Sequence, residues 1–508
     1  MIRKFIDTIE SLNEKRILLL LIGVTFALRL YAVLMAQGIA NDSAAYGFVA
    51  RDFLKGDFVK GLSSAFPPLY PFLIFLFSPD AMHVEITGRL LSLFFGTFAL
   101  IPLFYLVKEA IGREGAILTG LLYAFHPYLV TSSGMLLTEA TYWGLLTSSV
   151  YFFWTGLQKQ RGWRIALSGC FLGLAYLTRP EGIGYVLVYL AWVIVDGVLR
   201  KEWLKKLMLM GILIPSVLIF VIPYVMSIHQ ETGQWLISKK AVDAQSRFLE
   251  RGTEEAGFSR GDKSRGPAEK NSKILDLTKN VGRFLPSVAY HYFRAYHFSL
   301  WLFLFFGLTR MSQTFIAYEW FLASFVLFHL VSLSTFLPST IRFSIPVIPV
   351  SLFWAGAGIL EIKRYLGKTR ISNPEKVAFL LILLVMLVQL PESLKPERRH
   401  RAEQKRIGLW LRQNTPPDAV IMSNSPQETF YANREFILLP RVNPALGDPL
   451  LSYDEILHYA KTKGVRYILV DKNSREMNPN FVESIQSKDL KERFSKADQG
   501  VIIYEVVY

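Results

Sequence analysis

Long apolar stretches fill the first 390 residues of the chain, whereas polar residues dominate the part that follows. A helix needs about 20 mostly apolar residues to cross the hydrocarbon core of a bilayer. Apolar blocks that approach this length recur at residues 17–35, 86–107, 116–130, 140–157, 165–177, 183–199, 207–228, 298–308, 315–336, 343–360 and 377–390. The pattern predicts a polytopic all-α membrane domain of about eleven spans over residues 1–390, with a soluble domain over residues 391–508.

The basic residues predict how the chain is oriented in the membrane. With the N-terminus in the cytoplasm, the inside connections hold eighteen Lys and Arg residues, and the short outside connections hold five. Lys and Arg in short loops favour the cytoplasmic side. An odd number of spans then places residues 391–508 outside, and we expect a multi-pass protein of the cytoplasmic (inner) membrane. The net charge of +15 is therefore mostly a consequence of the topology. The sequence shows no platform of basic and aromatic residues that would indicate nucleic-acid binding.

The first outer loop, residues 36–85, contains a short amphipathic pattern. After Asn41-Asp42-Ser43, apolar residues follow at i, i+3, i+4 and i+7 spacing: Tyr46, Val49, Ala50 and Phe53. This spacing is typical of a helix that lies at the membrane interface, and Gly56-Asp57 ends it. A second apolar run reaches Phe77 but is too short to span a bilayer, so we expect it to be interfacial or re-entrant.

The second outer loop covers residues 230–295. Its middle, from residue 243 to residue 283, is charged, contains Gly and Ser, and shows no periodicity. Such composition favours a mobile segment. A long flexible loop of this kind could be a lid over a site, or it could be a connection without further role.

The last part of the chain alternates between helical and strand-like patterns. The predicted helices are 401–413 and 453–463, and the predicted strands are 419–422, 436–439, 465–470 and 501–507. Such alternation indicates a small α/β domain. It has no Gly-rich phosphate loop, so we interpret it as a docking or support domain. The single cysteine of the chain, Cys170, excludes an intramolecular disulfide and every metal site that needs several cysteines.

Charged residues at membrane depth are costly and are functional hypotheses by default. Arg29 lies inside the first predicted span, and Arg89 lies near the outer end of the second. Further charges fall at the same outer face: Asp42, Glu139, Arg179, Glu181 and Arg342. Five charges that four different connections bring to one membrane level indicate a site.

Each of these acids also has a structural interpretation. Asp42 could cap the interfacial helix, and Glu139 could favour the N-terminus of the next helix. Arg179 and Glu181 could form a salt bridge within one turn. These alternatives remain open at the level of the sequence.

The arginines have structural interpretations as well, since Arg89 and Arg342 could extend to lipid headgroups and Arg29 could pair with an acid. The layout nevertheless suits one kind of chemistry. A carboxylate within hydrogen-bond reach of a hydroxyl can take its proton. A guanidinium binds phosphate through bidentate bonds and stabilises the charge that a departing phosphate develops. We therefore expect a transfer from a lipid-linked phosphate that is reached from the bilayer.

Several motifs, taken in order, resemble those of the GT-C membrane glycosyltransferases, and in particular the branch of protein O-mannosyltransferases and lipid A aminoarabinose transferase. The motifs are Asp42-Ser43-Ala44-Ala45-Tyr46, Gly56-Asp57, Pro67-Pro68-Leu69-Tyr70-Pro71, Arg89, Leu177-Thr178-Arg179-Pro180-Glu181-Gly182, Ile341-Arg342-Phe343-Ser344-Ile345-Pro346, Trp410-Leu411-Arg412-Gln413-Asn414-Thr415-Pro416-Pro417-Asp418 and Lys463-Gly464-Val465-Arg466-Tyr467. They extend over nearly the whole chain. The resemblance implies inverting transfer of a sugar from a polyprenyl-phosphate donor, on the outer face, to an envelope glycan, lipid or protein.

The resemblance also implies roles for individual residues. The acid just after the first span, here Asp42, corresponds to the catalytic base, and Glu139 is our candidate for a second acid. The aminoarabinose branch has a phosphate-binding lysine where this chain has Phe66, so phosphate binding shifts to arginines. The candidates for phosphate binding are Arg342, Arg179 and Arg89, and the supporting candidates are Tyr46, Glu181, Pro68 and Tyr70.

Two other classes of protein fit parts of this pattern. A transporter or flippase for lipid-linked sugars would share the outer charges, although no internal repeat is visible in the sequence. A non-catalytic subunit of an envelope assembly would not need Asp42. The sequence gives no evidence for a cofactor or a catalytic metal, and His291 and His297 are too isolated to propose a metal site, but Asp42 and Glu139 could together hold a divalent ion.

Overall fold

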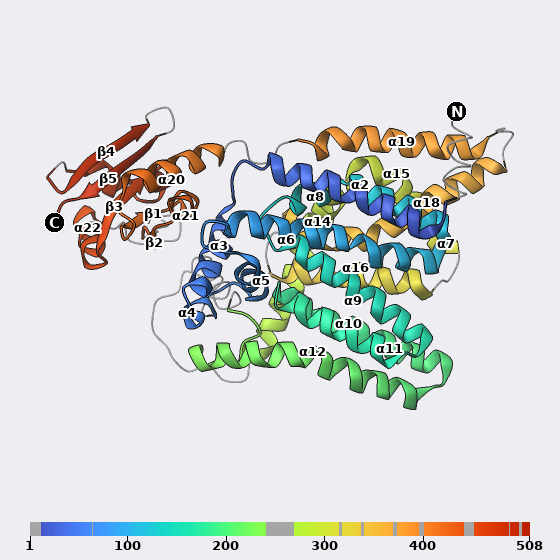
Figure 1. Ribbon diagram of the computed structural model, residues 1–508. Helices are drawn as coiled ribbons and strands as arrows, with labels where there is room; N and C mark the ends of the chain where they lie inside the picture. Colours follow the sequence, from blue (N-terminus) through green and yellow to red (C-terminus); the bar gives the residue numbers. More distant parts are fainter. Residues whose placement is uncertain are drawn as a thin grey trace.

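The computed structural model describes residues 12–62, 64–239, 269–313, 317–336, 340–368, 373–395, 401–440, 452–486, 488–496 and 500–508. It has a bundle of helices and, beside one end of this bundle, a small sheet domain (Figure 1). The predicted fold class, an all-α membrane region followed by an α/β domain, is confirmed.

The bundle consists of helices of very different lengths. In chain order they are α2 (Glu14–Met35), α3 (Asn41–Leu54), α4 (Phe58–Leu62), α5 (Leu69–Phe77), α6 (Val84–Phe98), α7 (Leu100–Phe125), α8 (Pro127–Ser133), α9 (Glu139–Lys159), α10 (Gly162–Tyr176), η1 (Pro180–Gly184), α11 (Tyr185–Arg200), α12 (Trp203–Thr232), α14 (Glu269–Tyr296), η2 (Phe298–Leu300), α15 (Trp301–Gln313), α16 (Ala317–Phe336), α17 (Ile341–Ser344), η3 (Ile345–Val347), α18 (Ile348–Gly367) and α19 (Pro374–Ser393).

Within the described residues, seven helical stretches are long and apolar enough to cross a membrane. One of them, Val84–Phe125, covers the predicted block 86–107 and most of the block 116–130, and Gly112, with a positive φ of 79°, interrupts the helix between the two. A positive φ suits glycine, which has no Cβ. Every predicted block lies mostly in helix, but α9 is less apolar and α10 is short. The number of crossings and the orientation stay predictions.

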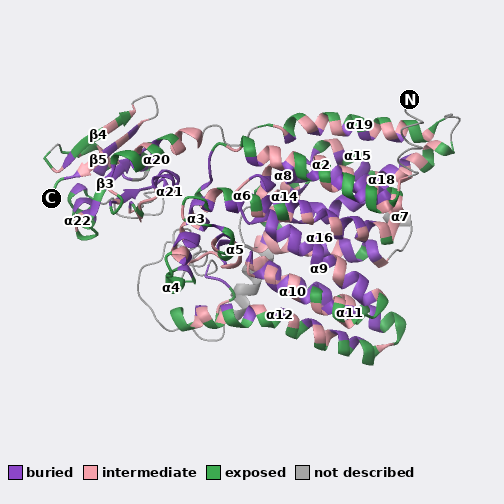
Figure 2. Cartoon of the chain, in the orientation of Figure 1, coloured by how far each residue is buried: buried purple, intermediate pink, exposed green. Residues whose placement is uncertain are grey.

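The outer surfaces of several helices are apolar. On α19, the exposed side chains include Leu380, Leu384 and Leu387, and α12 exposes Leu204 and Leu207 (Figure 2). A soluble protein rarely leaves such patches open to water. These helices therefore present the surface that a bilayer would cover.

The prediction of a loop that continues to residue 295 was wrong at its end. Helix α14 starts at Glu269, and Val288, Tyr292 and Tyr296 are buried along one of its faces. The charged first half of this helix hid the periodicity of the second half. The remainder of the predicted mobile segment, residues 240–268, lies outside the described residues.

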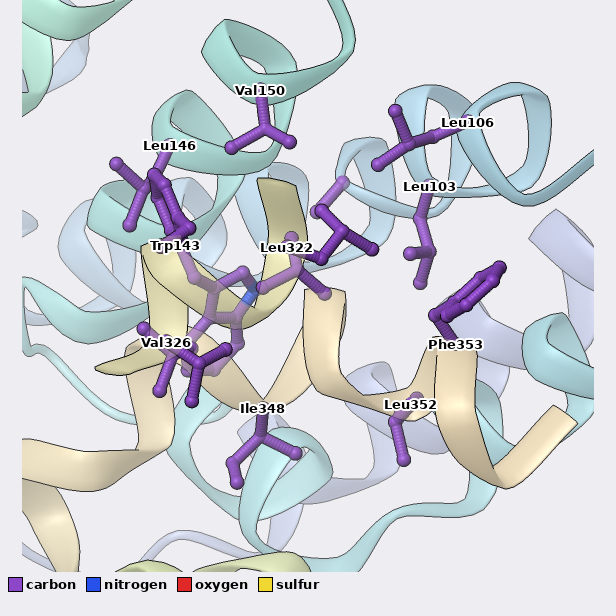
Figure 3. Close-up of a cluster of buried hydrophobic side chains, with 14 of the residues drawn as sticks. Leu103, Leu106, Trp143, Leu146, Val150, Leu322, Val326, Ile348, Leu352 and Phe353 are labelled. Carbon is purple, nitrogen blue, oxygen red and sulfur yellow. The ribbon is translucent and has the colours of Figure 1, made fainter. Parts of the chain in front are cut away.

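The centre of the bundle is a continuous apolar core (Figure 3). Figure 3 shows side chains from α7, α9, α16 and α18 that point toward one another, including Leu103, Leu106, Trp143, Leu146, Val150, Leu322, Val326, Ile348, Leu352 and Phe353. Inside a membrane, helices associate through close packing more than through the hydrophobic effect. Helices α15 and α18 show such packing, because a Cβ on Gly358 would lie 1.9 Å from the Phe303 carbonyl oxygen, and a Cβ on Gly307 would lie 2.0 Å from that of Trp354.

The sheet domain has five strands in the order β2-β1-β3-β5-β4. Its elements are α20 (Ala402–Asn414), β1 (Val420–Ser423), α21 (Pro426–Ala432), β2 (Glu435–Leu438), α22 (Tyr453–Thr462), β3 (Val465–Val470), α23 (Lys472–Met477), α24 (Pro479–Glu483), β4 (Leu490–Lys496) and β5 (Val501–Val506). Strand β1 pairs in parallel with β2 and β3, whereas β5 is antiparallel to β3 and β4. The four predicted strands and two predicted helices are confirmed.

Four elements of this domain were not predicted: β4, α21, α23 and α24. Strand β4 lies at an edge and is mostly exposed, so polar residues replace the apolar alternation that marks a strand. Helix α21 is only seven residues long and begins with Pro426, which fits the first helical position. Helix α21 also contacts α3.

Candidate active site

Helix α3 brings the predicted base to the end of the bundle. As predicted, this helix is amphipathic, and its buried face includes Tyr46, Ala50 and Phe53. Asp42 lies in its first turn, where the helix dipole favours a carboxylate. The N-cap is Ala40, which makes no side-chain cap hydrogen bond. The Asp42 carboxylate instead contacts an arginine from a distant segment.

That arginine is Arg342, in the short helix α17. Its Nη1 donates to Oδ2 of Asp42 at 2.6 Å, and its Nε donates to Oε1 of Glu139. Glu139 begins α9, and its side chain is only 1% exposed, whereas that of Asp42 is 42% exposed. One guanidinium therefore joins an accessible carboxylate to a buried one.

A second arginine shares the buried carboxylate. Nη1 of Arg179 donates to Oε1 of Glu139 at 3.4 Å, and its Nη2 donates to Oε1 of Glu181 at 3.1 Å. The guanidinium also lies 5.7 Å from the ring centre of Tyr142 and 5.3 Å from that of Phe343. Both distances suit a cation–π contact.

The charge state of Arg179 follows from these neighbours. Burial alone would lower the pKa of the Arg179 guanidinium, but the carboxylates of Glu181 and Glu139 raise it above its ordinary value. Burial, and then the negative charge of Glu139, also raise the pKa of the Tyr46 hydroxyl. Arg179 is therefore cationic and Tyr46 is neutral at any physiological pH.

The five predicted outer charges thus meet in one cluster, which we call the arginine–carboxylate cluster: Asp42, Glu139, Arg179, Glu181 and Arg342. It contains three acids and two arginines. The second oxygen of Glu139, Oε2, is buried and makes no hydrogen bond with the described residues. The turn salt bridge between Arg179 and Glu181 exists, but it is one part of the larger arrangement.

The two aromatic candidates, Tyr46 and Tyr70, pack against each other. The Tyr46 hydroxyl lies 3.5 Å from Oγ1 of Thr138, and its ring meets that of Tyr70 edge-on at 5.6 Å. Tyr70 is fully buried, and its hydroxyl donates to the Gly88 carbonyl at 2.8 Å. Tyr70 therefore packs against Tyr46 in the protein interior and does not face the accessible carboxylate of Asp42.

Pro68 has a similar scaffold position, directly before α5. The next backbone N–H, that of Leu69, donates to the carbonyl of Leu177 at 3.0 Å. This bond ties the first outer loop to the turn that carries Arg179. The double-proline segment therefore supports the turn.

Arg89 has different partners from those of the cluster. Its guanidinium binds Oε1 of Glu85 at 2.5 Å and the carbonyl oxygens of Ala36 at 2.6 Å and Gly38 at 3.3 Å. The side chain is 6% exposed, so it does not extend to headgroups. Among the described residues, the structure does not bring Arg89 into contact with Asp42, and its role in phosphate binding stays a prediction.

Arg29 is fully buried, and its partners are backbone carbonyls. Its Nη1 donates to the Thr25 oxygen at 3.3 Å and its Nη2 to the Tyr123 oxygen at 3.4 Å, while the guanidinium lies over the Tyr123 ring at 4.7 Å. Pairing with an acid, the structural interpretation from the sequence, is wrong for the part of the chain that the structure describes. Two carbonyl oxygens and one aromatic ring contact the guanidinium, while its Nε is buried and makes no hydrogen bond with the described residues.

The described residues contain no group of three or more His, Cys, Asp or Glu side chains that could hold a metal ion. The hypothesis that Asp42 and Glu139 together bind a divalent ion gains no support, because Arg342 lies between the two carboxylates. The cation between them is a guanidinium.

One residue that connects the two arginine-bearing segments was not predicted. Nε2 of His329 lies 2.9 Å from the carbonyl oxygen of Phe343, and its Nδ1 lies 2.7 Å from the Tyr185 hydroxyl. A carbonyl only accepts, so Nε2 carries the proton and Nδ1 accepts from Tyr185. His329 thus links the segment of Arg342 to the helix that follows Arg179. The only available signal was a polar residue inside an apolar block.

Comparison with known proteins bears on the fold of the chain. The family described as dolichyl-phosphate-mannose-protein mannosyltransferase matches residues 65–226. A search of curated protein sequences finds no match. ArnT from Cupriavidus metallidurans, in a crystal structure bound to undecaprenyl phosphate, is similar with a TM-score of 0.62 and 14% identity over 96% of this chain and 98% of that chain. The chain has the fold of the GT-C membrane glycosyltransferases.

The oligosaccharyltransferase of Archaeoglobus fulgidus in its apo form has a TM-score of 0.65 and 13% identity over 98% of this chain and 75% of that chain. The oligosaccharyltransferase AglB from Archaeoglobus fulgidus, in complex with an inhibitory peptide and a dolichol-phosphate, has a TM-score of 0.54 and 12% identity over 90% of this chain and 69% of that chain. Because the first two matches cover nearly the whole chain, the similarity includes the sheet domain. The resemblance to GT-C enzymes that the sequence indicated is confirmed.

Proposed function

We propose that this protein is an inverting glycosyltransferase that moves a sugar from a polyprenyl-phosphate donor to a hydroxyl of an envelope glycan, lipid or protein, at the outer face of the cytoplasmic membrane. One observation carries the proposal: the accessible carboxylate of Asp42 lies 2.6 Å from Arg342, which shares Glu139 with Arg179. Similar structures were solved with undecaprenyl phosphate and with a dolichol-phosphate, which supports the same class of donor here.

In this proposal the residues divide the reaction between them. The acceptor oxygen forms a bond to the anomeric carbon while Asp42 takes its proton. The bond from that carbon to the phosphate oxygen breaks, and the electron pair leaves with the polyprenyl phosphate. Arg342 and Arg179 stabilise the charge that develops on this phosphate. Glu139 holds the two guanidiniums in place, since it is too buried to meet an acceptor.

The contact between Asp42 and Arg342 also suggests an order of events. A phosphate that binds Arg342 competes with Asp42 for the same guanidinium, because both are anions within reach of Nη1. Donor binding would then free the Asp42 carboxylate to act as a base. Arg89 would contribute to phosphate binding only indirectly, through its bonds to Ala36 and Gly38.

The test is transfer by the purified protein. Radiolabelled undecaprenyl-phosphate sugars are incubated with envelope acceptors, and label in the acceptor is measured. The D42N variant should lose transfer by about 1,000-fold, within the range that general-base catalysis supplies. The matched control is D57N, because Asp57 lies in the same loop but caps the Lys60 N–H at 3.0 Å.

Full transfer by D42N would contradict the assignment of the base. Movement of labelled lipid across vesicle membranes without any transfer would instead support a flippase, and neither movement nor transfer would support a non-catalytic subunit.

A further inference from the structure

Residues 36–41, which comprise the connection between α2 and α3 and the first residue of α3, lead directly to Asp42, and other segments bind four of these six residues. From within the bundle, Arg89 donates to the carbonyl oxygens of Ala36 and Gly38 at 2.6 and 3.3 Å. These bonds to two carbonyls of one short segment fix the path of its backbone. They come from α6, which packs beside α2.

The sheet domain binds the rest of the same connection. Nη1 of Arg401 donates to the Ile39 carbonyl at 2.8 Å, and Nε2 of Gln427 donates to Oδ1 of Asn41. Gln427 lies at the start of α21, more than 380 positions away in sequence. The residue that carries the proposed base is therefore the direct neighbour of a residue that the sheet domain holds.

The fit between the sheet domain and the first outer loop is tight. A Cβ on Gly38 would lie 2.7 Å from Cβ of Arg401, and a Cβ on Gly47 would lie 2.3 Å from the ring of Phe430. Farther along α3, Arg51 donates to the Phe430 carbonyl at 2.8 Å, and its guanidinium lies 4.0 Å from the ring centre. Both the beginning and the end of α3 thus contact the sheet domain (Figure 1).

Glu85 joins the two sets of contacts. Its Oε1 accepts from Arg89 at 2.5 Å and from the Tyr431 hydroxyl at 3.1 Å, and its Oε2 accepts from Nζ of Lys405 at 3.2 Å. Tyr431 and Lys405 belong to the sheet domain, whereas Arg89 binds the connection. The carboxylate is 16% exposed, so water screens these bonds less than it would at an open surface.

We propose that the sheet domain is a positioning element for Asp42. Docking through Glu85, Arg401 and Gln427 holds residues 36–41 so that the Asp42 carboxylate meets Arg342. The inference rests on the proposed function, and it names the contacts that prepare the base. Misplacement of a catalytic group by about 1 Å can reduce a rate by about 100-fold, so small losses of docking should reduce turnover.

The experiment uses the full-length protein with Q427A and E85Q, separately and together. Hydrogen exchange of the backbone amides in residues 36–47 is followed by mass spectrometry, and kcat and KM for the donor are measured. Exchange in residues 36–47 should become about 10-fold faster in each variant, because the opening free energy of the segment falls. The turnover number kcat should fall by about 10-fold to 100-fold, with KM for the donor within about twofold of wild type.

The control is R493Q, because Arg493 pairs with Glu505 on the sheet and is remote from α3 in sequence and in fold. It should leave exchange and kcat at wild-type values. Unchanged exchange and kcat in both Q427A and E85Q would overturn the proposal, and so would a rise in KM without a change in kcat. If the wild-type protein transfers no sugar, the proposed function fails, while the exchange measurement still decides whether the sheet domain holds residues 36–47.

Discussion

At each end of α18 an arginine bridges two carboxylates, but the two clusters leave different groups accessible. At one end, Arg310 contacts Glu319 at 3.4 Å and Glu361 at 3.6 Å, and these carboxylates are 1% and 21% exposed. At the other end, Arg342 contacts Asp42, which is 42% exposed. The ion pairs are similar in kind, and their surroundings differ.

The end near α3 also holds a second guanidinium, that of Arg179, through the shared carboxylate of Glu139. Pairing is required at both ends, because a buried charge without a partner is strongly destabilising. Of the two clusters, the one near α3 adds an accessible carboxylate to two guanidiniums, and phosphate-dependent transfer needs this combination. The comparison teaches that accessibility distinguishes a candidate site from a structural ion pair.

Separate removal of Arg342 and of Arg310 should distinguish the candidate site from the structural ion pair most clearly. R342A should reduce kcat/KM by about 1,000-fold, because the charge on the departing phosphate loses its main partner. R310A should leave kcat per folded molecule at the wild-type value but lower the free energy of unfolding by about 3 kcal/mol, since it leaves the buried Glu319 unpaired. Steady-state kinetics and thermal unfolding of both variants provide the measurement. Equal losses of activity would remove the distinction between the two clusters.

A smaller effect is expected from the carboxylate that joins the two arginines. E139Q should reduce kcat by about 10-fold to 100-fold, because the guanidiniums lose the charged acceptor that aligns them. The comparison with D42N in the same transfer assay is decisive. If E139Q loses as much activity as D42N, Glu139 acts on the acceptor itself, as a second catalytic acid or base.

The smallest expected effect concerns Glu428, a reference acid outside both clusters. Burial, and then the charge of Asp471, raise the pKa of the Glu428 carboxyl from 4.5 to about 8. The folded state therefore holds a proton that the unfolded state releases above pH 4.5, so stability falls as the pH rises toward 8 and then levels off. The melting temperature of the wild type should fall by several degrees between pH 5 and pH 8, and E428Q should remove this dependence. An equal slope in E428Q would show that another group titrates.

The amphipathic spacing of Tyr46, Ala50 and Phe53 predicted α3, because one face of a helix must be buried whatever covers it. Membrane topology then predicted that the outer charges meet, since loops on one side of a bilayer can reach one another. Asp42 and Arg342 are 300 positions apart and nevertheless form an ion pair. Pattern and topology thus sufficed for α3 and for the members of the arginine–carboxylate cluster.

They did not suffice for contacts that depend on how distant segments pack. Phosphate binding by Arg89 stays a prediction, and its contacts with Glu85 and with three backbone carbonyls could not be predicted from the sequence. The contact of Gln427 with Asn41 depends on the docking of a whole domain, and no local pattern encodes it. The prediction of an acidic partner for Arg29 was also wrong for the described part of the chain, where two backbone carbonyl oxygens accept from its guanidinium instead.

The contact of backbones at Gly307 and Gly358 has a consequence for both ends of α18. With carbonyl oxygens at 1.9–2.0 Å from where a methyl group would stand, neither position admits even alanine without a shift of the helix axis. Helices α15 and α18 cross at this contact, so a tilt of α18 about it moves the two ends of α18 in opposite directions. A single added methyl group in the middle of the membrane region would therefore disturb Arg342 from a distance, without touching any charged group.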